Sequence, residues 1–204
     1  IDHHATIVSK GGIAAILSSM EQHQRNSRII ASCFAALCNL ASNLNVQTLI
    51  ATEGGIGMVL DAMNLHSTDS NIQEYGCAAL SNLSIRNPQN QKSIAEANGI
   101  STILSAMQQH LHDGGIQESA CEALGNMTSS DVKTRLKIGS EGGVEVILAA
   151  MKQHKETLAI QEHGRRALSN LTQDDLETKL LMGLKVEEEA RLMAEAVRMK
   201  AEGE

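Results

Sequence analysis

The chain has 204 residues and a formal net charge of −7 at pH 7. This acidic balance argues against a nucleic-acid binder, because proteins that bind the phosphate backbone present a basic surface. Hydrophobic residues make up 42% of the chain, enough for a buried core, while one proline and 1% of aromatic residues disfavour strands and leave helices uninterrupted. The composition therefore predicts an all-α protein.

The sequence shows no targeting or membrane signal. No apolar run approaches the roughly 18–20 residues that cross a bilayer, and Ile1-Asp2-His3-His4 is neither a charged start nor an apolar signal segment. The lack of an initiator Met predicts a piece of a longer protein or a processed product. An intracellular protein, cytoplasmic or nuclear, is also indicated by cysteines that lie in apolar sequence without a CxxC pair: Cys33, Cys38, Cys77 and Cys121.

Four blocks of the chain repeat the same residue types. Gly11-Gly12-Ile13 returns at offsets of 43, 44 and 44 residues, as Gly54-Gly55-Ile56, Asn98-Gly99-Ile100 and Gly142-Gly143-Val144. A methionine, a histidine and an Ala-Leu-x-Asn-(Leu/Met) block recur at the same offsets: Met20, Met63, Met107 and Met151; His23, His66, His110 and His154; Ala36, Ala79, Ala123 and Ala167 at the block starts. A period of this length predicts a repeat protein, with units at 1–42, 43–86, 87–130 and 131–173.

Each unit is predicted to contain a short, a medium and a long helix. Short helices are indicated at 1–10 and 90–97, before a glycine pair that suits a sharp break with positive φ. The medium helix after the pair has one apolar face, formed by Ile56, Val59, Leu60 and Met63.

The long helix carries Ile72, Ala79, Leu80 and Leu83 on one side. Small residues one turn into it predict a close approach between helices: Cys33, Gly76, Ala120 and Gly164.

The pattern GGI-x-x-[IV]-L-x-x-M, followed by IQE-x-x-[CG]-x-AL-x-NL, resembles the armadillo repeat, which also has three helices in about 40 residues. The resemblance covers nearly the whole chain: residues 11–172 carry three full periods and most of a fourth, and residues 1–10 resemble the first short helix. HEAT repeats, the nearest fold of this kind, usually lack the glycine pair and the ALxNL end. The resemblance implies an all-α, right-handed α-solenoid of about four repeats, forming a single domain over residues 1–204.

Residues 174–204 depart from the period, because the sequence 184–188 replaces the expected glycine pair. A polar-backed terminal helix that closes the apolar end is what a solenoid requires, so we predict a C-terminal cap here. A docking helix for another chain is the alternative. The predicted apolar stripe consists of Val186, Ala190, Met193, Val197 and Ala201.

The recurring histidines are predicted to be structural or surface residues. Equivalent positions in successive repeats are separated by about one helix packing distance, roughly 8–10 Å. Zinc ligands must each lie about 2 Å from one ion, so the histidines are poorly spaced for a shared metal. No GxxxxGK[ST], HExxH or GxSxG motif occurs. We therefore predict a protein without catalytic residues, metal or cofactor.

The "Asn ladder" comprises the asparagines near the ends of the long helices: Asn39, Asn82, Asn126 and Asn170. In armadillo proteins the Asn at this place projects from the concave face and hydrogen-bonds the backbone of an extended peptide. A carboxamide suits this because it offers both a donor and an acceptor. The alternative is that each Asn caps or braces the end of its helix.

Other groove positions follow from helical spacing around each Asn. Importin-α-like members have a Trp one turn before the Asn, and this chain has Ala35, Ala78, Glu122 and Arg166 there, which argues against nuclear-localisation-signal binding of that kind. Two turns before the Asn lie Tyr75, a candidate anchor, and His163.

Glutamates stand eight residues before three of the asparagines, at Glu74, Glu118 and Glu162. In a groove they favour a ligand with Lys or Arg. As residues of a helix start they complement the helix dipole, and their regularity favours this second interpretation. Glu122 breaks the repeat pattern and is the better candidate for specificity.

These observations predict a monomeric, non-catalytic protein-interaction module that holds an extended or helical, partly basic segment of a partner protein. The alternative is a structural or regulatory spacer of a larger protein, with its groove occupied in cis. The predicted partner-binding residues are Asn39, Asn82, Asn126, Asn170, Tyr75, Ala78, Glu118, Glu122, Arg166 and His163.

Overall fold

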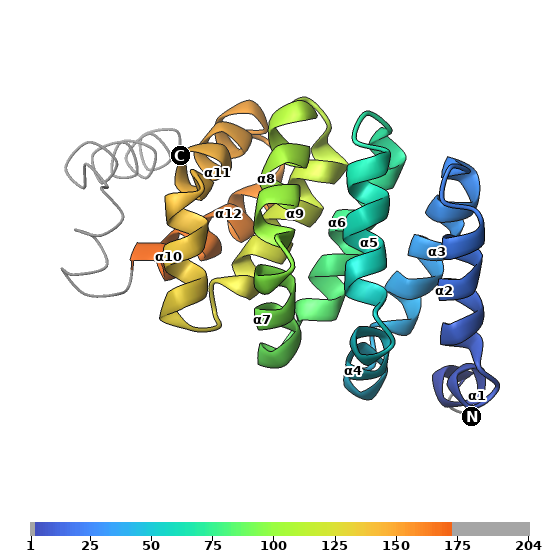
Figure 1. Cartoon of the computed structure of the whole chain (residues 1–204). Coiled ribbons are helices and arrows are strands. Elements are labelled where there is room, and N and C mark those ends of the chain that lie inside the picture. The colour runs from blue at the N-terminus through green and yellow to red at the C-terminus, as the bar shows by residue number, and fades with distance from the viewer. Residues whose placement is uncertain (1–2, 173–204) are drawn as a thin grey trace.

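The computed structural model describes residues 3–172, which form twelve α-helices and no strand (Figure 1). This confirms the all-α prediction. The predicted C-terminal cap at 174–204 lies outside the described residues, and the exact unit boundaries remain predictions. In chain order the helices are α1 (His3–Ser9), α2 (Gly12–Gln22), α3 (Ser27–Leu40), α4 (Leu44–Thr52), α5 (Gly55–Leu65), α6 (Ser70–Ser84), α7 (Pro88–Glu96), α8 (Gly99–Gln109), α9 (Gly114–Met127), α10 (Val132–Ser140), α11 (Gly143–Gln153) and α12 (Leu158–Thr172).

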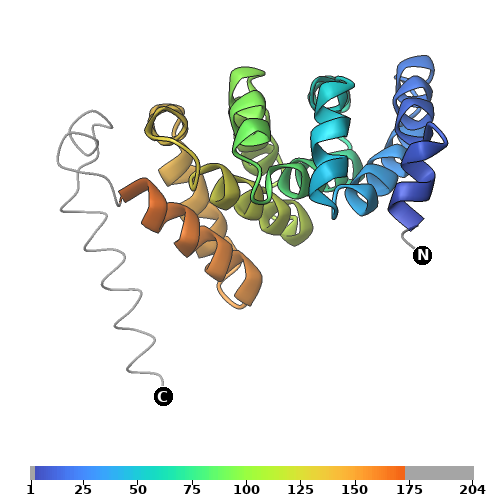
Figure 2. The ribbon, with the colours of Figure 1, turned by 90° about the horizontal axis from the view of Figure 1, so that it is seen from below.

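The helices are stacked in layers, as an α-solenoid requires. The long helices α3, α6, α9 and α12 lie side by side in one layer, and the medium helices α2, α5, α8 and α11 form a second (Figure 2). Successive long helices are in closer contact than successive medium helices. The stack therefore curves with the long helices on its inner side.

Side-chain caps fix where many of the helices begin. The Asp69 carboxylate accepts hydrogen bonds from the first amides of α6, and Asp113 does the same for α9. Asn43, Asn87 and Asp131 cap the short helices α4, α7 and α10. These bonds satisfy amides that have no partner within the helix. The backbone amide of Thr134, which donates to Asp131, lowers the pKa of this carboxyl.

The glycine pairs have two separate requirements. Gly54 has φ 84°, a left-handed conformation that costs glycine little, and this confirms the predicted break. Its neighbour Gly55 is needed for a close approach, because a Cβ there would lie 2.5 Å from Cγ2 of Ile50 and 2.8 Å from its carbonyl oxygen. In the third unit Asn98 takes the left-handed position at φ 63°.

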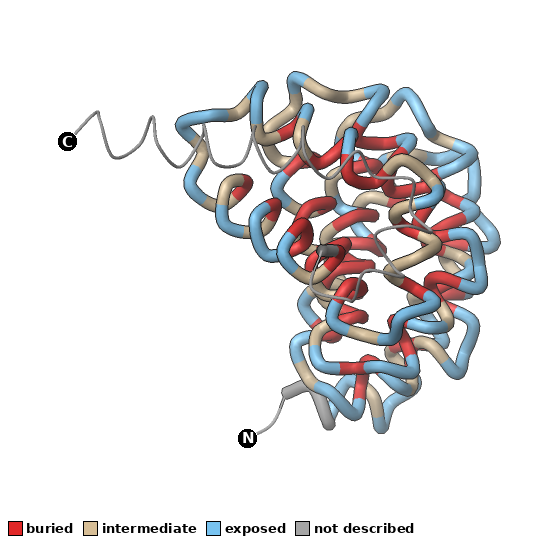
Figure 3. Tube along the Cα trace, turned by 90° about the vertical axis from the view of Figure 1, so that its left-hand side faces the viewer, coloured by how far each residue is buried: buried red, intermediate tan, exposed pale blue. Residues whose placement is uncertain are grey.

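Buried positions concentrate between the helices (Figure 3). The predicted apolar faces of the medium and long helices are buried, and Phe34 is fully so. A Cβ at Gly76 would lie 2.5 Å from Cγ of Met63 and 3.2 Å from Cε2 of Phe34, which confirms the predicted close approach there. Gly164 meets Met151 in the same way, with 2.7 Å to Sδ.

The four cysteines are free thiols. Cys33, Cys77 and Cys121 are buried, as predicted, and Cys38 is half-buried. Burial raises the pKa of the Cys77 and Cys121 thiols to about 12 and that of Cys38 to about 11. Because the thiolate is the reactive form, these three side chains behave as small hydrophobic residues.

Candidate partner-binding face

All ten predicted site residues lie on the long helices, which form the inner layer of the stack. Asn39 is on α3, and Asn82, Tyr75 and Ala78 are on α6. Asn126 follows on α9 with Glu118 and Glu122, and Asn170 on α12 with Arg166 and His163. Asn39, Tyr75, Glu118 and Arg166 are exposed, and the other six are half-buried.

Three members of the Asn ladder hydrogen-bond the preceding unit. Asn82 Nδ2 donates to Cys38 O at 3.0 Å, and Asn126 Nδ2 donates to Ser81 O at 3.3 Å and to Ser81 Oγ at 3.2 Å. Asn170 Nδ2 donates to Thr128 Oγ1 at 3.2 Å. The side chains therefore brace neighbouring long helices against each other, which supports the structural alternative for part of their function.

The oxygens of these carboxamides differ in their use. Asn126 Oδ1 accepts a hydrogen bond from the guanidinium of Arg166 at 3.1 Å. Within residues 6–171, Asn82 Oδ1 accepts none, and the Asn39 side chain forms no hydrogen bond at all. Thus Asn39 and Asn82 keep hydrogen-bonding capacity on the inner layer.

Arg166 reaches from α12 across to α9. Its guanidinium also donates to the backbone oxygen of Glu122 at 3.4 Å. Gly125 leaves room for it, since a Cβ at that position would lie 2.9 Å from Arg166 Nε. Arg166 therefore covers the Asn126 position at the C-terminal part of the layer.

The middle of the layer carries acidic groups and one aromatic side chain. Tyr75 is 40% exposed, and its backbone oxygen accepts a hydrogen bond from Cys38 Sγ at 3.6 Å. Glu74 leans against α9, where a Cβ at Gly115 would meet its carboxylate carbon at 2.7 Å. Across the described side chains, Glu118 and Glu122 enter no ion pair, although Arg166 brings a positive charge close to Glu122.

The recurring histidines join successive units at the turns after the medium helices. Nε2 of three of the four lies within hydrogen-bonding distance of a carbonyl oxygen of the preceding unit: His66 with Gln24 at 2.6 Å, His110 with Ser67 at 2.8 Å and His154 with Leu111 at 2.8 Å. A carbonyl only accepts, so this nitrogen carries the proton. The prediction that these three are structural residues is therefore confirmed. No group of three or more metal-ligand side chains occurs in the described part of the chain.

A set of glutamines that the sequence reasoning missed completes the same turns. Gln73 Nε2 donates to Met63 O at 2.8 Å and to His66 O at 3.0 Å, at the end of α5. Gln117 and Gln161 make the equivalent pairs of bonds. Their signal in the sequence is the recurring IQE, whose middle residue is the glutamine. We call the six residues the turn ladder: His66, His110, His154, Gln73, Gln117 and Gln161.

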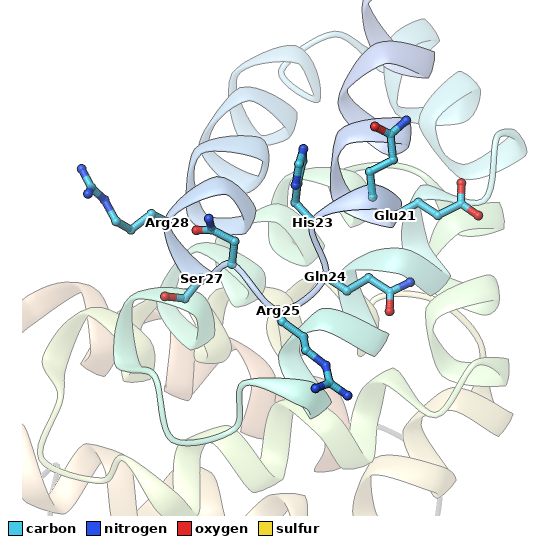
Figure 4. A pocket seen from close by; sticks show the side chains of 8 residues that line it. Glu21, His23, Gln24, Arg25, Ser27 and Arg28 are labelled. Carbon is cyan, nitrogen blue, oxygen red and sulfur yellow. The ribbon is translucent and has the colours of Figure 1, made fainter.

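Two shallow hollows lie at the N-terminal end of the stack and not on the predicted face. The first surrounds the α2–α3 turn and is lined by residues 21–28. Glu21, Arg25 and Arg28 point away from one another there (Figure 4). These side chains do not converge on a common ligand. The second hollow lies between α2 and α3 and has a mixed lining, with apolar residues such as Ile16 and Ile29 beside Asn26 and Arg28.

The comparisons with known proteins agree with this architecture. The sequence matches the LRRK2 ARM repeat family over residues 6–181, and ARM repeats generally serve as protein-interaction modules. No curated protein matches it. None of the described helices is both long and apolar enough to cross a membrane.

Two crystal structures of engineered proteins have the same fold. Structural-genomics target OR329 is 25% identical with a TM-score of 0.74, and target OR366 is 19% identical with a TM-score of 0.72. Each likeness covers 83% of this chain, and it spans only 66% of the first structure and 67% of the second. With the family match over most of its length, the chain belongs to the LRRK2 ARM repeat family.

Proposed function

We propose that the inner layer of long helices binds an extended segment of a partner protein. The observation that carries the proposal is the unused hydrogen-bonding capacity of Asn39 and Asn82 in that layer. A module with this function has no need of catalytic residues, metal or cofactor. The partner is a protein, as for ARM repeats generally.

The geometry at Asn82 suits a peptide backbone. Its bond to Cys38 O uses one N–H of the amide and holds the side chain in place. The second N–H and Oδ1 remain for a peptide carbonyl and a peptide N–H. An extended chain advances about 6.6–7 Å in two residues, close to the spacing of packed helices, so neighbouring units can meet successive dipeptides. Little reorganisation is needed on binding, which favours affinity.

The chemistry around Asn82 favours a basic segment with an apolar or aromatic side chain. Tyr75 supplies an exposed ring with a polar tip, the type of residue that dominates many interfaces. Glu118 and Glu122, on the next helix, supply negative charge without a cationic partner among the described residues. Ala78, one turn before Asn82, leaves space beside it.

The C-terminal part of the layer is less available to a ligand. Asn126 donates to Ser81 and accepts from Arg166, so its hydrogen-bonding groups are engaged on both sides. We therefore propose that the main peptide-binding site lies on α3 and α6, around Asn39 and Asn82. Asn126, Asn170, His163 and Arg166 then adjust the choice of ligand at the C-terminal end.

A structural spacer is the second candidate function. It is favoured by the bonds that Asn82, Asn126 and Asn170 make to the preceding unit. In that case the layer would be covered by another part of a larger protein, and the ladder would serve stacking alone.

A peptide-display selection on the full chain distinguishes the two functions. The double variant Asn39→Ala/Asn82→Ala is compared with Asn45→Ala, which changes an exposed asparagine on the short helix α4. A common basic motif that binds the parent and Asn45→Ala, is lost in the double variant and weakens with salt supports the proposal. No enrichment above background, with the double variant folded by circular dichroism, contradicts it and favours the spacer.

A further inference from the structure

The first residue of each short helix from the second unit onward is apolar and faces solvent. Leu44 begins α4, Pro88 begins α7 and Val132 begins α10, so the three recur at intervals of 44 residues. Leu44 is 52% exposed and Val132 46%, and Pro88 is also exposed. Leu65, another exposed leucine, has Gln109 at the equivalent place in the next unit and does not recur. We call Leu44, Pro88 and Val132 the apolar row.

The three short helices lie side by side along one edge of the stack, which aligns the members of the row (Figure 1). Asn90 Nδ2 on α7 donates to Gln47 O on α4 at 3.2 Å, and Lys137 Nζ on α10 donates to Ala95 O on α7 at 2.6 Å. Packed helices are separated by roughly 8–10 Å. An α-helix advances about 10.5 Å in seven residues. A helix lying across the short helices would therefore meet the row with apolar residues seven positions apart.

Positive charges flank the apolar row. Arg86 is exposed two residues before Pro88, and Lys133 is exposed next to Val132. Neither forms an ion pair within the described residues. Arg86 also holds φ 51°, a left-handed conformation that is costly for a residue with a Cβ, so its charge is a candidate functional feature. Asp131 adds a carboxylate beside the row, but it is engaged in capping α10. The row therefore fits an amphipathic helix with acidic residues.

The C-terminal part of the sequence supplies a segment of this kind. Residues 173–204 lie outside the described residues and follow α12, which contacts α10. The 13 residues 173–185 can span up to about 43 Å, several times one helix packing distance. Within 186–201 the apolar residues recur in groups seven positions apart, and three glutamates stand at the start. The apolar groups are Val186 with Ala190, Met193 with Val197, and Ala201, and the glutamates are Glu187, Glu188 and Glu189.

We propose that residues 186–201 form an amphipathic helix that docks in cis along the apolar row, with its first turn at α10 and its last turn at α4. This direction places Glu187–Glu189 beside Lys133 and Met193 against Pro88. The reverse direction would place the glutamates beside α4, which carries no charged residue. A covalent link makes docking intramolecular, at an effective concentration in the millimolar range, so a weak contact is populated.

The location separates this inference from two others in the molecule. The apolar stripe that the sequence predicts as a cap covers an edge of the stack and not its end. The row belongs to the short helices, so the docking is independent of peptide binding on the inner layer of long helices.

Hydrogen exchange of the amides in residues 186–201 of the full chain tests the proposal. We expect exchange at least roughly tenfold slower than in an unstructured chain, at any protein concentration. Leu44→Asp/Val132→Asp should restore the unstructured rate, and an aspartate in the first turn is compatible with both short helices. Leu65→Asp/Leu158→Asp is the matched control, because it adds the same charges at apolar residues that are at least as exposed but lie outside the row.

A pair of introduced cysteines locates the helix. Pro88→Cys with Met193→Cys should form a disulfide on mild oxidation, whereas Ser105→Cys, at an exposed position of α8, should not pair with Met193→Cys. The four native cysteines are buried or half-buried and do not compete.

Three results overturn the proposal. One is exchange in 186–201 of the parent at the unstructured rate. Another is slow exchange that survives Leu44→Asp/Val132→Asp, without the expected disulfide, which would place the segment elsewhere, as in a cap at the end of the stack. The third is slowing that grows with protein concentration, or a disulfide that links two chains, which would assign the row to a second copy of the chain.

Discussion

The turn ladder and the Asn ladder run along the same stack, and they differ in how much of their hydrogen-bonding capacity the fold uses. Gln73 donates to two backbone carbonyls of its own unit, and His110 bonds a carbonyl of the unit before it. Asn82 makes one such bond through Nδ2 and leaves its oxygen unpartnered among the described residues, whereas the equally unpartnered oxygen of Gln117 in the turn ladder is buried. A polar residue that recurs in every unit therefore indicates a contact between units before it indicates a ligand site. Only hydrogen-bonding groups that are both unused and accessible point to a ligand.

The largest effect that this comparison predicts is at the turn ladder. Gln73→Leu keeps the side-chain volume but removes the side-chain donor to the Met63 carbonyl and one of the two donors to the His66 carbonyl, which keeps the bond from the Asp69 amide. Gln73 is buried, so we expect the free energy of unfolding to fall by about 2 kcal/mol. Urea denaturation measures it, and Gln109→Leu, at an exposed position of α8, should stay within about 0.5 kcal/mol of the parent. Equal losses in the two variants would contradict a specific role for Gln73.

A smaller effect separates two members of the Asn ladder. Asn82→Ala removes the bond to Cys38 O and should lower the free energy of unfolding by about 1 kcal/mol. Asn39→Ala removes no bond within the described residues and should change it by less than about 0.5 kcal/mol. Thermal unfolding of the two variants gives the comparison. If Asn39→Ala is as destabilising as Asn82→Ala, the capacity that we assign to Asn39 is already in use.

The histidines give a third, slightly weaker contrast. His154→Ala loses the hydrogen bond to Leu111 O and should cost about 0.5–1 kcal/mol of unfolding free energy. His23→Ala, at the N-terminal end of the stack, should be nearly neutral, because this exposed side chain makes no hydrogen bond within the described residues. Denaturant melts of the parent and the two variants measure the change, and a neutral His154→Ala would show that the turn bonds contribute little.

The helical content and the stacking could be predicted from the sequence because their causes are local. The glycine pair marks a left-handed residue at Gly54 and a close approach at Gly55, and both recur in each unit. The apolar faces follow from the 3.6-residue period. A short, a medium and a long helix in each unit could therefore be predicted without knowing the contacts between units.

The partners of the polar ladders could not be predicted in the same way. The acceptor of His110 is a backbone oxygen 43 residues earlier. Because every residue has a backbone carbonyl, the residue types of the sequence do not identify this acceptor. Gln73 was missed for a similar reason, since its acceptors are carbonyls of the preceding turn. For the asparagines of the Asn ladder, the sequence alone does not decide between bracing of neighbouring helices and ligand binding. The contacts of Asn82 support bracing, while peptide binding remains a proposal.

The smallest predicted effect tests how far the proposed peptide-binding site extends along the inner layer. Arg166→Ala frees the oxygen of Asn126 and removes a positive charge near Glu122. For a basic peptide selected on the parent chain, we expect affinity to rise by about two- to fivefold, measured by fluorescence anisotropy. Stability should change by less than about 0.5 kcal/mol, because Arg166 is exposed.

Arg165→Ala is the matched control, since it removes the same charge from an exposed neighbour on α12 without freeing Asn126. A larger gain for Arg166→Ala than for Arg165→Ala means that the Asn126 oxygen takes up a peptide amide once it is released. Equal gains mean that charge alone acts, and that the ligand ends before α9. A loss of affinity in Arg166→Ala alone would reverse the assignment, because Arg166 would then contact the ligand itself while it holds Asn126.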